Sequence, residues 1–182
     1  LLQFADRYKD SDLGERALLA TFVAARAAGD AELLYTVGQQ LIDRYPESEQ
    51  VAGVASTMGQ AAVTRFEFKR ALGYLDQASR ISKVPAQQVA LLLTAGELRE
   101  RLTDNTGARD AYRRALDLAK DPASRSEAAA HLADLAERTQ PPAGVVRELE
   151  PLAEPFEPEI AARLGLAMLR VGRTDEAEMM LL

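Results

Sequence analysis

Apolar side chains recur at spacings of three and four residues along most of the chain. Leu18, Phe22 and Ala25 form one such series, and another begins at Leu33. Apolar and polar residues alternate nowhere over as many as six positions. A period between three and four residues is that of an amphipathic helix, whereas strict alternation marks a strand. The pattern therefore predicts an all-α chain.

Turn-forming residues divide this pattern into short helices. Gly29–Asp30 is typical of a helix end followed by a new N-cap, and Tyr45–Pro46 of another helix end. Asp121–Pro122 and Glu157–Pro158 place proline at a first helical position, where its missing N–H is not needed. The segments are about 12 to 17 residues long with turns of a few residues, so successive helices should pack as antiparallel hairpins.

Composition agrees with helices and excludes several classes of function. Alanine makes up roughly one residue in six, and aromatic residues only 5%. The absence of cysteine removes disulfides, thiolate zinc sites and cysteine nucleophiles. A net charge of −6 argues against binding the phosphate backbone of nucleic acids. No apolar run approaches the roughly 20 residues that span a bilayer, so we expect no direct membrane insertion of this segment.

The two ends suggest a segment of a longer protein. Leu1 is not an initiator methionine, and no basic region or cleavage site of a leader follows it. The last residues, from Glu178 to Leu182, continue a helical pattern without a stop signal. We therefore expect a fragment.

An internal repeat of 37 residues runs through the middle of the chain. It places Gly59, Gly96 and Ala133 at equivalent positions. The same offset carries Ala71 to Ala108, Ala78 to Ala115, and Asp6–Lys9 to Asp43–Pro46. Small residues that recur together in this way indicate stacked copies of one supersecondary unit.

The repeat resembles the tetratricopeptide repeat. In that family helix A carries a large residue, Leu, and then Gly or Ala, and helix B carries Ala, an aromatic residue and Ala. The segment from Leu164–Gly165 through Gly172–Ala177 matches most closely. The resemblance implies a right-handed α-solenoid of antiparallel helix pairs. It would form a single array over residues 1–182, with a half unit at 1–11 and units near 15–48, 52–85, 89–122, 126–157 and 158–182.

Glycine positions and departures from the repeat pattern carry further expectations. Gly59, Gly96 and Gly165 should mark places where helix A and helix B cross closely, since a larger side chain would push the helices apart. The first unit departs from the pattern with Phe22 at the equivalent position. Pro151 should kink or end helix B of the fourth unit.

The segment Arg65–Arg70 mixes aromatic and basic residues. Such a mixture could bind nucleic acid, with Phe66 and Phe68 stacking on bases. Its place in a turn between two helices favours a different interpretation, in which both rings fill the core of the hairpin.

Candidate catalytic groups are few. His131 is the only imidazole, and it has no second ligand for zinc and no adjacent serine or cysteine nucleophile. The pairs Glu97/Glu100 and Asp134/Glu137 each lie on one helical face, which favours a solvated surface over acid–base chemistry. No glycine-rich phosphate loop is present. We therefore predict a chain without enzymatic activity, metal site or cofactor.

The resemblance implies a binding surface along the inner, concave face of helix A in each unit. Members of the family that grip an acidic C-terminus carry a Lys and Asn clamp there, and this sequence lacks it. The implied groove reads basic, acidic, basic along the array, which suits a partner with Lys or Arg at its middle. Its candidate residues are Arg16, Leu19, Val23 and Arg26; Ser56, Thr57, Gln60 and Thr64; Thr94, Glu97, Glu100 and Arg101; His131, Asp134, Glu137 and Arg138; and Arg163, Leu166 and Arg170.

Three functions fit these features. The first is a non-catalytic scaffold for a protein or peptide partner. The stretch Asp43–Ser48 resembles the repeat junctions of bacterial envelope-associated proteins. This resemblance favours an assembly or secretion system in the bacterial periplasm or envelope, and the cytoplasm is the second choice of location. The second is the sensor or substrate-presenting arm of a multidomain enzyme or regulator. The third, RNA binding by helical repeats, is opposed by the acidic groove residues. The oligomeric state is left open.

Overall fold

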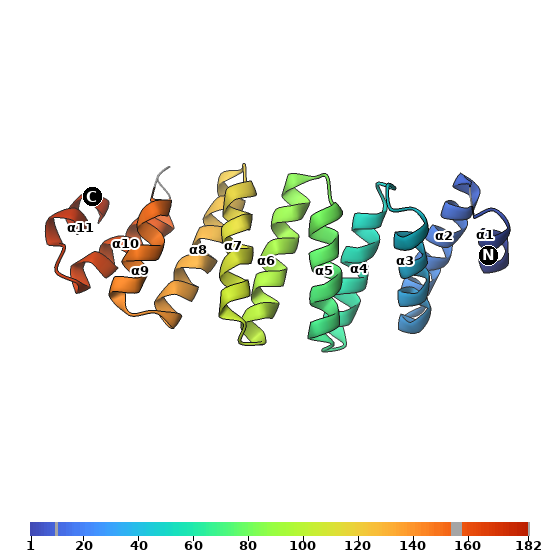
Figure 1. Ribbon diagram of the computed structural model, residues 1–182, viewed down its shortest axis with the longest axis horizontal. Coiled ribbons are helices and arrows are strands. Elements are labelled where there is room, and N and C mark those ends of the chain that lie inside the picture. The colour runs from blue at the N-terminus through green and yellow to red at the C-terminus, as the bar shows by residue number, and fades with distance from the viewer. Residues whose placement is uncertain (10, 154–157, 182) are drawn as a thin grey trace. The chain divides into compact units, whose positions relative to one another are not determined.

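The computed structural model describes residues 1–9, 11–153 and 158–181, and these form helices joined by short turns (Figure 1). The helices are α1 (Leu2–Arg7), α2 (Asp12–Ala28), α3 (Ala31–Arg44), α4 (Val51–Thr64), α5 (Phe68–Ile81), α6 (Pro85–Arg101), α7 (Asn105–Leu118), α8 (Pro122–Thr139), α9 (Pro142–Leu149), the 3₁₀ turn η1 (Glu150–Leu152), α10 (Pro158–Arg170) and α11 (Thr174–Leu181). The all-α prediction is confirmed. Glu157, expected to precede the helix at Pro158, and the predicted unit ends at 157 and 182 lie outside the described residues.

The chain forms two compact units, Leu1–Lys83 and Val84–Leu182. In the first, α1 packs on α2, α2 pairs with α3, and α4 pairs with α5, while α3 and α4 join the two pairs. In the second, α6 pairs with α7, α8 with α9, and α10 with α11, while α8 also contacts α6, α7 and α10. The expectation of one continuous array over residues 1–182 stays a prediction.

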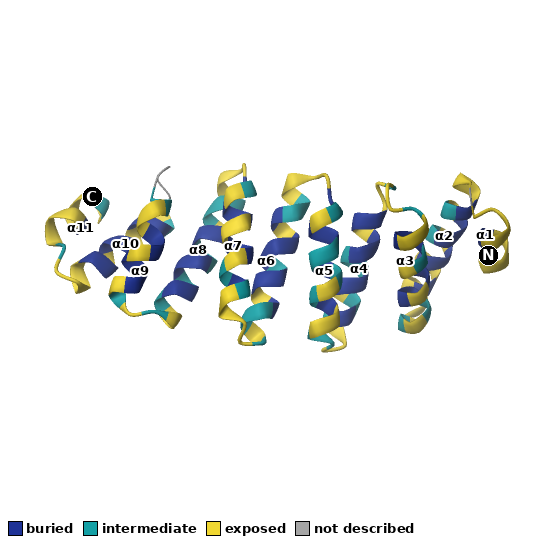
Figure 2. Cartoon of the chain, in the orientation of Figure 1, coloured by how far each residue is buried: buried dark blue, intermediate teal, exposed yellow. Residues whose placement is uncertain are grey.

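Buried residues follow the contact faces of the helices in each unit (Figure 2). In the second unit one apolar core runs from α6 to α11 and contains the fully buried side chains of Tyr112, Leu132 and Leu164. Many core positions are alanine, which lets neighbouring helices approach closely. Each helix pair therefore buries its apolar face against its neighbours in the same unit, as repeat architectures require.

Large and small residues face each other across the helix pairs. A Cβ atom on Gly59 would lie 2.9 Å from the Leu75 side chain, and one on Gly96 would lie 2.3 Å from the Tyr112 ring. The corresponding contact for Gly165 is 2.7 Å, to Leu181. These distances are shorter than carbon atoms can approach, so each glycine on helix A accommodates a large residue of helix B.

The first helix pair reverses this arrangement. Phe22 occupies the position on helix A that is glycine in the next unit, and Gly38 occupies the position on helix B that corresponds to Leu75. A Cβ atom on Gly38 would lie 3.0 Å from the Phe22 ring and 2.3 Å from the Met58 sulfur. The departure noted at Phe22 is thus compensated by a glycine on the facing helix.

Helix ends share one backbone motif, and the first three of them are 37 residues apart. The residues Gly29, Phe66, Thr103 and Gly172 have positive φ angles of 70°, 60°, 61° and 83°. At each, the N–H donates to the carbonyl three residues back, and the next N–H donates to the carbonyl five residues back. This is the Schellman motif, in which a left-handed residue closes a helix.

The fourth turn breaks the series at Gln140, whose φ of −132° is extended. The following residue is Pro141, which has no N–H to donate to the carbonyl five residues back. The motif therefore cannot form there. Nearby, Pro151 ends helix B of this pair as predicted, because α9 stops at Leu149 and gives way to a 3₁₀ turn.

The prediction that Phe66 fills the hairpin core is wrong. Its side chain is 79% exposed, since the left-handed position after α4 directs it away from the helix pair. Phe68 is half-buried and meets the Phe66 ring edge-on at 6.1 Å. Arg65 and Arg70 each contact Glu67 at 2.9 Å, so the basic residues of this segment neutralise an internal carboxylate.

Replacing Gly96 by alanine should destabilise the protein. The new methyl group would overlap the Tyr112 ring, which costs about 1 to 3 kcal/mol and outweighs the helix-propensity gain of about 1 kcal/mol. Gly73→Ala is the matched control, because a Cβ atom at that residue would have no other atom within 4 Å and alanine should stabilise α5. Thermal melting of both variants tests the packing, and a neutral Gly96→Ala would contradict it.

Replacing Phe66 by glycine should stabilise the first unit. Glycine adopts the left-handed conformation without steric penalty, and the exposed ring contributes little packing. The expected gain is about 0.5 to 1 kcal/mol after allowing for the greater freedom of glycine in the unfolded chain. Denaturant unfolding measures it, and a loss of stability would show that the Phe66–Phe68 contact dominates.

Candidate partner-binding groove

All the candidate groove residues lie on the first helix of a pair: on α2 and α4 in the first unit and on α6, α8 and α10 in the second. None of their side chains is buried. Some contribute apolar surface, since Val23 is 54% and Leu166 44% exposed. The residues are therefore accessible to a partner within each unit, and their role in binding stays a prediction.

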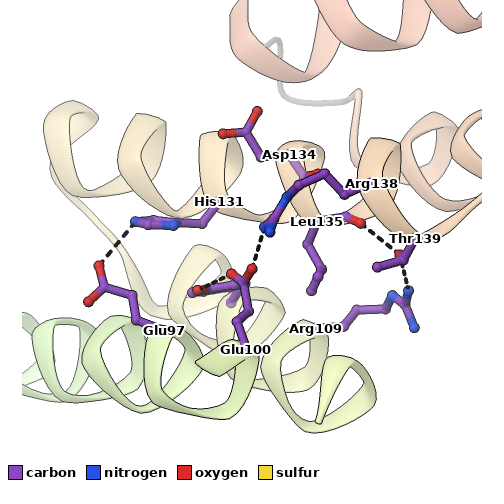
Figure 3. A network of polar contacts seen from close by, with 9 residues as sticks. Glu97, Glu100, Arg109, His131, Asp134, Leu135, Arg138 and Thr139 are labelled. Carbon is purple, nitrogen blue, oxygen red and sulfur yellow. Dashed lines mark hydrogen bonds and ion pairs between the residues drawn. The ribbon is translucent and has the colours of Figure 1, made fainter. Parts of the chain in front are cut away.

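Glu100 and Tyr112 join helix A to helix B at the centre of the second unit's groove. The Tyr112 hydroxyl donates to Glu100 Oε1 at 2.6 Å, and Arg138 from α8 pairs with the other carboxylate oxygen (Figure 3). The pKa of Tyr112 is raised well above its ordinary value, mainly because the side chain is buried and secondly because its hydroxyl donates to the Glu100 carboxylate. The phenol therefore remains protonated and keeps donating to Glu100.

His131 lies flat against the same tyrosine. The two rings are stacked with centroids 4.9 Å apart and planes 15° from parallel. The Nε2 atom of His131 is 3.7 Å from Glu97 Oε1, and Figure 3 shows this pair beside the contact between Glu100 and Arg138. His131 is thus held by a ring and a carboxylate, and within the described residues no nucleophile accompanies it.

Arg163 of α10 completes the polar surface. It contacts Asp134 at 2.8 Å and also pairs with Glu137. In the repeat register Asp134 corresponds to Glu97, and Arg163 corresponds to His131. The same acid-to-base contact therefore recurs between successive helices of the second unit, and we call the two contacts the groove rungs.

These contacts correct the expected charge order. The predicted acidic middle of the groove is partly neutralised, because Glu100 pairs with Arg138 while Asp134 and Glu137 share the single positive charge of Arg163. The sequence shows each charge but cannot show that arginines of the following helix reach back to them. Glu97, with a side chain 51% exposed, keeps the most accessible carboxylate.

Each unit has a hollow beside groove residues. In the second unit a hollow of about 440 Å³ is lined by Glu97, Glu100, Arg101, His131 and Arg138, all of them predicted. In the first unit a smaller hollow of about 200 Å³ includes the predicted Arg26 and Thr64, and its other lining residues are Ala25, Gly29, Asp30, Ala31, Leu34, Ala61 and Arg65. The hollow of the second unit is lined by polar residues. The hollow of the first unit is lined mostly by apolar residues together with Arg26 and Arg65.

The helix-A threonines present only part of their hydrogen-bonding capacity. The hydroxyls of Thr57, Thr64 and Thr94 donate to carbonyl oxygens of their own helices at 2.9, 2.8 and 2.9 Å. They are left to accept rather than donate. Tyr112 was not among the groove residues expected from the sequence, although an aromatic residue on helix B facing a glycine on helix A was a signal for its central place.

Within the residues that the structure describes, no three His, Asp or Glu side chains gather as they would around a metal ion. Across the same residues, no helix combines the length and apolar character needed to cross a bilayer.

Comparison with solved structures places the fold. A crystal structure of MamA superposes with a TM-score of 0.56 at 15% identity, covering 91% of this chain and 87% of that one. A second MamA structure gives a TM-score of 0.52 at 16% identity, covering 87% and 88%. The chain has a tetratricopeptide-like helical repeat fold. BtubC from P. vanneervenii also resembles this repeat protein, with a TM-score of 0.53 at 12% identity over 99% of this chain and 84% of that one.

The sequence itself matches no protein-family model and no curated protein. At 12 to 16% identity, the likeness of this repeat protein to the three structures concerns the fold alone. Function must therefore be argued from its own side chains.

Replacing Tyr112 by phenylalanine should weaken the second unit. The variant keeps the ring against Gly96 but removes the donor to Glu100, for an expected loss of about 1 to 2 kcal/mol. Tyr74→Phe is a matched control, because that hydroxyl makes no hydrogen bond within the described residues and its loss should change stability by less than about 0.5 kcal/mol. Equal effects in denaturant unfolding would contradict a structural role for the Tyr112–Glu100 bond.

Proposed function

We propose that this repeat protein is a non-catalytic scaffold that binds a partner protein or peptide along the helix-A groove. The observation that carries the proposal is the second unit's hollow, in which five predicted groove residues meet at an accessible polar surface. Repeat proteins bind extended partners on surfaces of this kind. The fold supplies the surface, and the side chains supply its selectivity.

Ion pairs between neighbouring helices support this function by holding the surface in place. Arg138 and Arg163 are immobilised by carboxylates of neighbouring helices, so a partner meets side chains already ordered. Ordering a long side chain at an interface costs about 0.5 to 1.5 kcal/mol, and this cost is met during folding instead of during binding. A pre-organised polar surface favours specific recognition over nonspecific binding.

The accessible charges indicate the chemistry of the partner. Glu97 faces only His131 across 3.7 Å, and Arg101 forms no ion pair within the described residues. These two residues are one helical turn apart on α6 and both line the hollow. The matching segment carries Lys or Arg opposite Glu97 and an acidic or amide side chain opposite Arg101.

The proposal extends to a cellular setting. The Asp43–Ser48 stretch, which resembles junctions of bacterial envelope-associated repeat proteins, supports an assembly or secretion system of the bacterial envelope. Fractionation of cells expressing the full-length protein tests this part, and exclusive recovery from the cytoplasm would contradict it.

Exchanging the charges of the hollow should abolish partner binding. The double variant Glu97→Lys/Arg101→Glu leaves the net charge unchanged; it removes the Glu97–His131 contact but keeps the ion pairs of Arg138 and Arg163. We expect at least a tenfold loss of affinity, about 1.4 kcal/mol, because two attractive contacts become repulsive. The measurement is pull-down with the intact protein followed by calorimetry on the partner that it returns.

The matched control exchanges an equivalent pair outside the groove. Asp110 and Arg114 are exposed on α7 at the same spacing of four residues, so Asp110→Lys/Arg114→Glu repeats the chemistry on helix B. A partner of the groove is captured by the wild type and by this control but not by the groove variant. If the wild type, the control variant and the groove variant captured the same proteins and had the same circular dichroism, the groove would be excluded as the binding site.

A further inference from the structure

A second hollow lies on the helix-B side of the second unit, between α7 and α9. It encloses about 390 Å³ and is lined by Arg109 and Arg113 of α7, Gln140, and Gly144, Arg147 and Glu148 at α9. None of these residues belongs to the helix-A groove. We call this the arginine hollow.

A buried carboxylate organises the arginine hollow. The Glu148 side chain is only 6% exposed, and its Oε1 lies 2.6 Å from Arg109 Nε and 3.9 Å from Arg113 Nη2. The contact with Arg109 is an ion pair by distance, and its atoms are not aligned for a hydrogen bond. Gln140 donates to the other carboxylate oxygen of Glu148. Arg109 Nη2 also contacts the Thr139 hydroxyl at 3.3 Å, as Figure 3 shows, so this guanidinium is fixed on two sides.

Gly144 is part of the same construction. A Cβ atom at this position would lie 2.6 Å from Gln140 Oε1. A side chain there would therefore displace the amide that bonds Glu148. The floor of the hollow is built from mutually fitted parts, unlike a chance cluster of surface arginines.

Positive charge remains in excess after these contacts are counted. Three guanidinium groups and one carboxylate line the hollow, in a protein whose net charge is −6. Arg113 touches Glu148 only at the limit of an ion pair and its side chain is 46% exposed, while Arg147 is exposed and forms no ion pair within the described residues. A concave surface concentrates the field of these two charges.

We propose that the arginine hollow binds an acidic segment of a protein partner, at a site separate from the helix-A groove. Guanidinium groups recognise carboxylates through paired, parallel hydrogen bonds, and Arg113 and Arg147 have donors available for such contacts. A volume of about 390 Å³ is far larger than the roughly 30 Å³ of one water molecule, so the hollow accommodates side chains of a peptide better than a single small anion. Glu148 is a positioning residue that orients Arg109 beneath the site.

The test uses a fluorescein-labelled hexaglutamate peptide and the intact protein, with binding followed by anisotropy at about 50 mM salt, where screening is weak. We expect Arg113→Gln/Arg147→Gln to weaken binding at least about tenfold, because both accessible charge-assisted contacts are lost. The folded structure should be retained, since both side chains are accessible, and thermal melting verifies this.

The control variant Arg80→Gln/Arg114→Gln removes the same charge from two exposed arginines outside the hollow, on α5 and α7. Its effect should remain below about twofold, as expected for a change in distant surface charge. Equal weakening by the two double variants, or no binding by the wild type, would overturn the proposal. Complete displacement of the peptide by about 10 mM phosphate would also overturn it, by assigning the hollow to a small anion at an ionic strength too low for general screening.

Discussion

The close contact between a glycine on helix A and a large side chain on helix B is the constraint on which the second unit's groove depends. Because Gly96 has no side chain, the Tyr112 ring lies directly against α6. From that position its hydroxyl reaches Glu100 and its face supports His131. A packing requirement of the core thereby positions two polar residues of the surface, and a larger residue at position 96 would displace both.

The repeat period acts through local backbone chemistry as well as through packing. Three turns with left-handed residues 37 positions apart close their helices with the same two hydrogen bonds, although the residues are glycine, phenylalanine and threonine. The motif depends on the N–H groups and tolerates the change of side chain at the expense of conformational strain. Where Pro141 removes one N–H, the turn opens and the following helix, α9, is short. This short helix also forms one side of the arginine hollow, and α7 forms the other.

Periodicity was sufficient to predict the all-α fold, because it shows which face of each helix is apolar. The groove positions came instead from the resemblance to the tetratricopeptide repeat, and the structure shows that none of these side chains is buried. Periodicity failed for Phe66 because hydrophobicity does not reveal that a residue occupies a left-handed position, which directs even an aromatic ring into solvent. It also failed for the groove charges. Whether Arg163 turns towards Asp134 or towards solvent depends on the spacing of stacked helices and on side-chain rotamers, and neither is written in a single sequence.

The different use of arginine on the two sides of the second unit implies different modes of recognition. In the groove, Arg138 and Arg163 form ion pairs with carboxylates of neighbouring helices, so the acidic charge of the surface is partly neutralised. The selectivity of the groove therefore rests on the placement of ordered polar groups. The arginine hollow is lined by three guanidinium groups and one buried carboxylate, so attraction extends over roughly the Debye length of 8 to 10 Å and depends strongly on salt. For a partner that bound both surfaces, the hollow would supply long-range electrostatic attraction and the groove would supply selectivity. The two surfaces share α7, on which Tyr112 of the groove contact and Arg109 of the arginine hollow lie only three residues apart, so the placement of this one helix affects both.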